Sequence, residues 1–138
     1  MKKIDILKPI SVRVETETGW LEAKLSGDQW SADGIEIKLS PAPKGVNLTA
    51  KADSTGILAI AVRWPTSFEP RALILGDAWE RGYGDLTWEP LRWERNNHWY
   101  ALIDEGETHS ALGVRTLAGA MVSWRLDACG ATDRKSVV

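Results

Sequence analysis

The chain has 138 residues and a mass of 15.3 kDa, which is the size of one small domain. This length excludes a (β/α)8 barrel, which needs about 250 residues, and the apolar (43%) and charged (26%) fractions exclude a disordered chain. The net charge of −2, without a run of Lys or Arg, argues against nucleic acid or a membrane surface as the partner.

Apolar residues that alternate with polar ones predict β-strands along most of the chain. The pattern starts at Val12 and Val14, whose side chains would share one face of a strand. Turn residues separate such runs at intervals of roughly ten residues, which is typical of an antiparallel sandwich or barrel. No long segment has a helical period, so we predict an all-β antiparallel β-sandwich. The runs lie at 12–15, 21–25, 35–39, 46–51, 58–64, 72–75, 99–104, 110–115 and 122–127.

Tryptophan is unusually frequent, with eight residues against two Tyr and one Phe. Trp64 and Trp124 lie on the apolar faces of clear strand patterns, so we predict that both are in the core. Trp88 and Trp93 are five positions apart, so a continuous strand would turn them to opposite faces and expose at least one. The pattern leaves the other tryptophans open.

The segment 76–95 interrupts the strand pattern with three glycines, three tryptophans and many charges. Aromatic rings pack on the apolar face of a sugar, and carboxylates accept hydrogen bonds from its hydroxyls. Gly82 and Gly84 would let the backbone approach a ligand closely. The alternative is a structural corner in which Arg81 pairs with Asp77 or Asp85. We name as candidate substrate-binding residues Asp77, Trp79, Glu80, Arg81 and Tyr83.

Catalytic and metal motifs are weak in this sequence. A glycosidase carboxylate pair needs a cleft between its members, and a flat sandwich offers none, so we assign no catalytic residue. Asp104, His109 and Ser110 could form a triad on paper but lack a nucleophile-elbow pattern. The single Cys129, without a Cys/His cluster, predicts neither a disulfide nor a metal site. No phosphate-binding glycine motif is present, so we expect no cofactor.

One run is specific enough to compare with known families. Residues 75–88 read Leu-Gly-Asp-Ala-Trp-Glu-Arg-Gly-Tyr-Gly-Asp-Leu-Thr-Trp, and shorter motifs follow at 99–100, 108–109, 113–116 and 123–127. Together they resemble the N-terminal β-sandwich, or supersandwich, of glycoside hydrolase family 36 α-galactosidases (melibiases). The resemblance covers about residues 70–127.

In that family the sandwich precedes a catalytic barrel that carries the two Asp residues of a retaining mechanism, and this barrel is absent here. The resemblance implies a non-catalytic domain that packs on the barrel and lends residues to the galactose subsite, with Asp77 and Trp79 in the matching positions. One alternative is a free-standing carbohydrate-binding module that presents Trp79, Trp88 and Trp93. Another is a structural or oligomerisation sandwich.

The resemblance stops at Asp127, so we expect a sandwich domain at 1–127 and a tail or truncated continuation at 128–138. Missing strands would leave open sheet edges, which favour homo-oligomers by edge-strand pairing. The opening residues lack the apolar segment of a signal peptide, so we expect a cytoplasmic protein. We expect the chain alone to be inactive as an enzyme.

Overall fold

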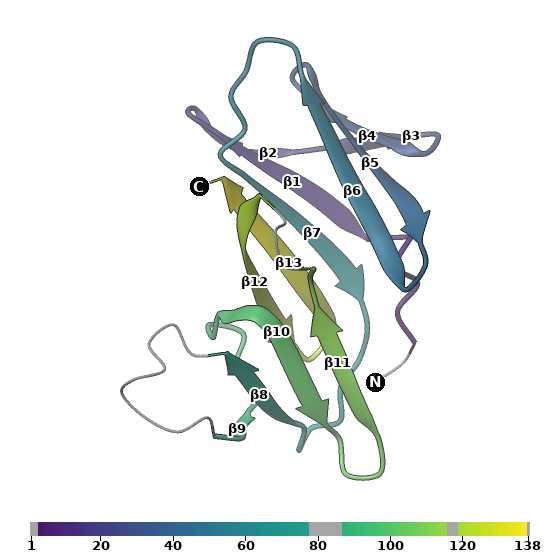
Figure 1. Cartoon of the computed structure of the whole chain (residues 1–138), viewed down its shortest axis with the longest axis vertical. Helices are drawn as coiled ribbons and strands as arrows, with labels where there is room; N and C mark the ends of the chain where they lie inside the picture. The colour runs from purple at the N-terminus through teal and green to yellow at the C-terminus, as the bar shows by residue number, and fades with distance from the viewer. Residues whose placement is uncertain (1–2, 78–86, 116–118, 138) are drawn as a thin grey trace.

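A computed structural model describes residues 3–77, 87–115 and 119–137. In these residues the chain forms thirteen strands and no helix, arranged as two antiparallel sheets (Figure 1). The predicted all-β antiparallel sandwich is therefore confirmed. In the described part of the chain, no helix has the length and apolar character needed to cross a membrane.

The larger sheet crosses the whole molecule and contains most of the strands. Along it, β11 (His109–Gly113) pairs with β10 outside the main path. The main path runs in the order β2 (Gly19–Glu22), β1 (Ser11–Thr16), β7 (Ala59–Pro65), β13 (Gly130–Val137), β12 (Ala120–Asp127), β10 (Asn97–Asp104), β8 (Leu73–Asp77) and β9 (Glu89–Pro90).

The smaller sheet lies near β1 and β2, at the end of the molecule away from β8–β9 (Figure 1). Its hairpin between β4 and β5 turns at Asp33 (φ 45°) and Gly34 (φ 75°), and two consecutive positive φ angles define the turn that suits the strand twist. The sheet runs in the order β3 (Lys24–Ser26), β4 (Gln29–Ala32), β5 (Ile35–Ala42) and β6 (Gly45–Ala52).

The core forms where the alternating strands turn their apolar faces toward each other. Val12 and Val14 of β1 are fully buried, and Ile35 and Ile37 of β5 are 1% exposed. These side chains belong to one cluster that also contains Trp64. The period-two pattern thus predicted the buried faces correctly, because alternate side chains of a strand leave on opposite sides.

Residues 130–137, which the sequence analysis placed in a tail, form β13 in the middle of the larger sheet. The strand pairs with β12 along its whole length and with β7 from Gly130 to Ser136. The expected boundary at Asp127 falls at the β12–β13 hairpin. The pattern concealed this strand because its inward positions include Asp133, which is 3% exposed, and Lys135.

A charged pair holds the β12–β13 hairpin against β7. The guanidinium of Arg63 donates two hydrogen bonds to the Asp127 carboxylate, at 2.6 and 2.9 Å, and one to Thr132 Oγ1 at 3.2 Å. Asp127 also accepts a hydrogen bond from the Cys129 backbone N–H. A Cβ on Gly130 would lie 2.9 Å from the Trp64 backbone carbonyl oxygen as well as against the Arg63 guanidinium, and because the backbone cannot move aside this position requires glycine.

Strand β10 is irregular where it changes partners. It pairs with β12 at Asn97 and His98, and with β11 from Tyr100 onward. Trp99, at the change, has φ 68°, which is unusual for a bulky residue. Next to it the Asn97 side chain packs against Gly76 of β8, where a Cβ would lie 2.2 Å from Asn97 Oδ1.

The longest edge strand in the described part of the chain is β6, which pairs only with β5 and has eight residues. Its second backbone edge could accept another strand. Homo-oligomerisation by edge pairing stays a prediction.

Replacing Gly76 with Ala should lower the free energy of unfolding by about 1–3 kcal/mol, because the new Cβ would overlap the buried Asn97 side chain. Urea unfolding followed by tryptophan fluorescence measures the change. Gly56→Ala is the matched control, since no atom lies within 4 Å of its Cβ position. Equal stability of the two variants would contradict the close packing of Gly76 against the Asn97 side chain.

The Arg63–Asp127 pair should make the free energy of unfolding depend on pH in the acidic range. The hydrogen bonds from Arg63 hold the pKa of Asp127 below its ordinary value, although desolvation opposes them. Because the pKa of Asp127 is lower in the folded state, the pair contributes fully to the free energy of unfolding above the ordinary carboxyl pKa. This contribution is lost as the pH falls through the lowered pKa. Asp127→Asn should therefore cost about 1 kcal/mol at pH 6, and this difference should shrink on acidification toward pH 2.

The test is to measure the free energy of unfolding of the wild type and of Asp127→Asn between pH 6 and pH 2. Glu22→Gln is the control, because Glu22 lies 3.8 Å from Arg13 and its side chain is 65% exposed. A difference for Asp127→Asn that stays constant with pH would argue against the pair as its source.

Candidate functional site

Most of the cluster named from the sequence lies outside the described residues. Asp77 is the last residue of β8, and its backbone is paired with His98 of β10. The structure therefore places the start of the cluster at one end of the β8–β10 ladder. The other named residues, which fall outside the description, are Trp79, Glu80, Arg81 and Tyr83.

The next described segment, residues 87–95, carries two exposed indoles. Trp88 is 45% exposed and Trp93 is 58% exposed, the latter among the highest values of the large apolar residues described. At least one exposed ring was predicted, and both are exposed. They do not share one continuous strand, because β9 ends at Pro90, which has no backbone N–H to continue the ladder. We refer to residues 87–95 as the tryptophan segment.

The tryptophan segment is attached to the sheet by its middle. Glu89 and Pro90 pair with Ile74 and Leu73 of β8, and Leu91 packs against the core cluster. Beyond Leu91 the chain turns, and the Arg95 N–H donates to the Arg92 carbonyl at 3.1 Å. The two indoles are therefore carried on an anchored piece of backbone at the edge of the sheet.

Three charged side chains of the tryptophan segment form one cluster. Glu89 Oε2 accepts hydrogen bonds from Arg92 at 3.0 Å and from Arg95 at 2.8 Å. Arg92 is 62% exposed, whereas Arg95 is 21% exposed, so the cluster is partly open to solvent. Such a group offers both donors and acceptors to a polar ligand, and exposed pairs of this kind add little stability. These residues were not among the candidates named from the sequence, although the i,i+3 spacing of Glu89 and Arg92 is compatible with an ion pair.

A third exposed indole differs from these two. Trp20 on β2 is 37% exposed, but the guanidinium of Arg13 lies 5.0 Å from its ring centre and that of Arg134 lies 5.5 Å away. Cation–π contacts of this kind occupy the ring. Among the described residues, neither Trp88 nor Trp93 has such a partner, so their rings are the more open to a ligand.

The remaining described tryptophans are buried, apart from Trp99. Trp64 and Trp124 are 5% and 6% exposed, and their ring centres are 6.0 Å apart, which confirms both as core residues. Trp30 is buried against the same cluster, and Trp99 is half-buried. The structure thus separates a core set of indoles from an exposed set.

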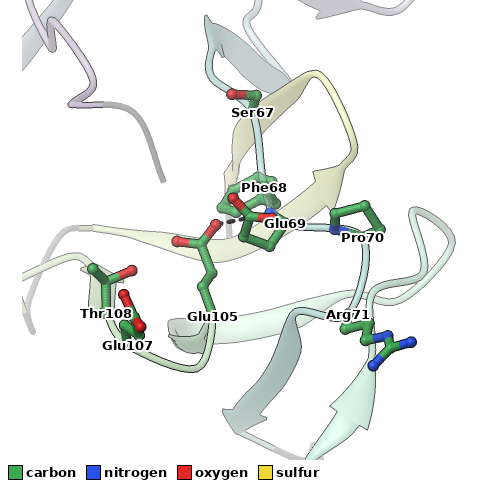
Figure 2. Close-up of a pocket in the computed structure, with 8 residues that line it drawn as sticks. All are labelled: Ser67, Phe68, Glu69, Pro70, Arg71, Glu105, Glu107 and Thr108. Carbon is green, nitrogen blue, oxygen red and sulfur yellow. Dashed lines mark hydrogen bonds between the residues drawn. The ribbon is translucent and has the colours of Figure 1, made fainter.

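A hollow on the surface lies between two loops that are distant in sequence (Figure 2). Glu105 accepts a hydrogen bond from the Glu69 backbone N–H at 2.9 Å, and this bond ties the loops together. Arg71 extends away from Glu105 in this view. The lining residues are Ser67, Phe68, Glu69, Pro70, Arg71, Glu105, Glu107 and Thr108. Sequence reasoning missed the hollow because only the β-topology brings the two loops together.

Asp104, His109 and Ser110 do not form a catalytic triad in the structure. His109 Nδ1 lies 3.4 Å from Asp104 Oδ1, because the two residues are directly opposite on β10 and β11. Ser110 is opposite Ile103, so its side chain leaves from the other face of the sheet. Cys129 is exposed in the β12–β13 turn. Within the described residues no group of three or more His, Cys, Asp or Glu could hold a metal ion.

Comparison with known proteins returns no relative: no family model, no curated protein and no solved structure matches the chain.

The exposure of the tryptophan segment can be checked by quenching. Trp93→Phe should lower the fraction of the fluorescence that acrylamide quenches, because this variant removes an exposed indole. Trp64→Phe should raise that fraction, because it removes a buried indole of the same kind. An unchanged or increased quenchable fraction in Trp93→Phe would contradict the exposure of the Trp93 ring.

Proposed function

We propose that the tryptophan segment is a carbohydrate-binding surface, and that the chain serves as a non-catalytic N-terminal domain of an α-galactoside hydrolase. In this role the domain lends Trp88 and Trp93 to a galactoside, together with the neighbouring candidates Asp77 and Trp79. The proposal assigns no catalytic group to this chain.

The observation that carries the proposal is the exposure of the two indoles on an anchored backbone. Burying a large apolar side chain is favourable by about 1.5–3 kcal/mol, so a ligand that covers these rings gains part of this free energy. Leu73, whose backbone is opposite Pro90, is a further exposed apolar side chain at this edge. The C–H face of a pyranose fits such a surface.

The charged cluster supports a sugar over a purely apolar partner. Arg92 offers donors at the surface, and Glu89 still has acceptor capacity on its second oxygen. Sugar hydroxyls act as both donors and acceptors, so they can bond to both groups. The galactoside itself is suggested by the family resemblance of residues 75–88.

Two expectations accompany this proposal and stay predictions. One is the cytoplasmic location. The other is that the isolated chain does not hydrolyse a chromogenic α-galactoside.

The test is a titration of the chain with melibiose, followed by two-dimensional NMR of the indole N–H groups. We expect saturable shifts of the Trp88 and Trp93 signals in the millimolar range. Trp93→Ala should weaken binding at least about fivefold, because it removes a stacking surface, which corresponds to about 1 kcal/mol.

Trp20→Ala is the matched control, because Trp20 is exposed but its ring is occupied by Arg13 and Arg134. Its affinity for melibiose should equal that of the wild type. Maltose serves as the second sugar and reports whether the surface prefers α-galactosides. Absence of binding to either sugar, with the fold intact, would reject the proposed function.

A further inference from the structure

A polar residue faces the interior of the sandwich on the central strand. Asp133 of β13 is directly opposite Trp124 of β12 and Val62 of β7, and all three are buried. Facing side chains in such a pair are close neighbours, with Cβ atoms about 5 Å apart.

Each of these two side chains has one polar atom without a hydrogen-bond partner among the described residues. The atoms are Trp124 Nε1, which is a donor, and Asp133 Oδ1, which is an acceptor. The second carboxylate oxygen, Asp133 Oδ2, is bound by Lys135 Nζ. Buried polar atoms of native proteins are almost always paired, with protein or with ordered water.

The neighbouring indole, that of Trp64, lies in the same core and has its N–H group hydrogen-bonded. Trp64 packs beside Trp124 with ring centres 6.0 Å apart, and its Nε1 donates to the Ile6 carbonyl at 3.0 Å. The two indoles therefore share burial and surroundings but differ in hydrogen bonding.

The two unpartnered atoms are complementary, but they are not bonded directly. A water molecule can accept from the indole N–H and donate to the carboxylate oxygen at the same time, and buried waters typically bind such groups. Burial raises the pKa of Asp133, while the charge of Lys135 acts against this rise. A donor on Oδ1 would help the carboxylate to remain charged inside the sandwich.

We propose that the sandwich binds one internal water molecule, which accepts a hydrogen bond from Trp124 Nε1 and donates one to Asp133 Oδ1. This water links β12 to β13 within the core and fixes the Trp124 ring. The Trp124 backbone carbonyl in turn accepts from Asn97 Nδ2 at 3.2 Å, at the start of β10 beside the end of β8. The hydration site thus supports the strands from which the candidate sugar site extends, but it does not depend on sugar binding.

The experiment is water-selective NMR on ¹⁵N-labelled protein. Signals of the two indoles are assigned from Trp124→Phe and Trp64→Phe. We expect a cross-peak between water and the Trp124 indole N–H that reflects a long-lived bound water. The Trp64 indole N–H, bonded to Ile6, should show a cross-peak at least fivefold weaker.

Asp133→Leu removes the acceptor, and it should abolish the Trp124 cross-peak in protein that keeps its fold. If this variant does not fold, the comparison of the two indoles in the wild type still decides. A slowly exchanging Trp124 N–H without a water cross-peak would overturn the proposal, since it would indicate a direct bond to a protein acceptor such as Asp133 Oδ1 or Asn97 Oδ1. Equal cross-peaks on both indoles would also overturn it, since they would indicate general access of solvent.

Discussion

The structure depends on the insertion of β13 between β7 and β12. The strands before residue 66 supply one side of the larger sheet, and the strands after residue 72 supply the other. β13 is the strand that joins them, because it is hydrogen-bonded to β7 on one edge and to β12 on the other. The last described residues of the chain therefore hold its two halves together.

This arrangement explains where the polar groups of the sandwich lie. On the outer side, Arg63 of β7 binds Asp127 at the β12–β13 turn, and Gly130 leaves space for the guanidinium. On the inner side, the buried Asp133 is paired with Lys135. A central strand with charged inward residues is costly unless these charges are paired, and here the two partners come from the same strand.

The candidate site lies at the opposite end of the larger sheet from β2. β8 pairs with β10, and the two residues of β9 pair the tryptophan segment with β8. Leu91 and the Glu89–Arg95 pair fix its course while leaving Trp88 and Trp93 open. An anchored backbone with exposed rings is the combination that ligand binding requires, because little ordering remains to be done on association.

The sequence by itself determined the fold class and the apolar faces of the core. Val12, Ile35 and Trp124 could be recognised because their own neighbours alternate in polarity, and this local signal survives in any β-sandwich. Part of the candidate site was also predicted, since an exposed ring was expected at Trp88 or Trp93.

Only the tertiary structure decided the place of β13, the burial of Asp133 and the difference between Trp20 and Trp93. The physical reason is that these properties depend on cross-strand neighbours. A carboxylate can be buried when Lys135 pairs with it, and a ring is occupied when guanidinium groups lie over it. Such partners are set by register and topology, which the alternation within one strand does not encode.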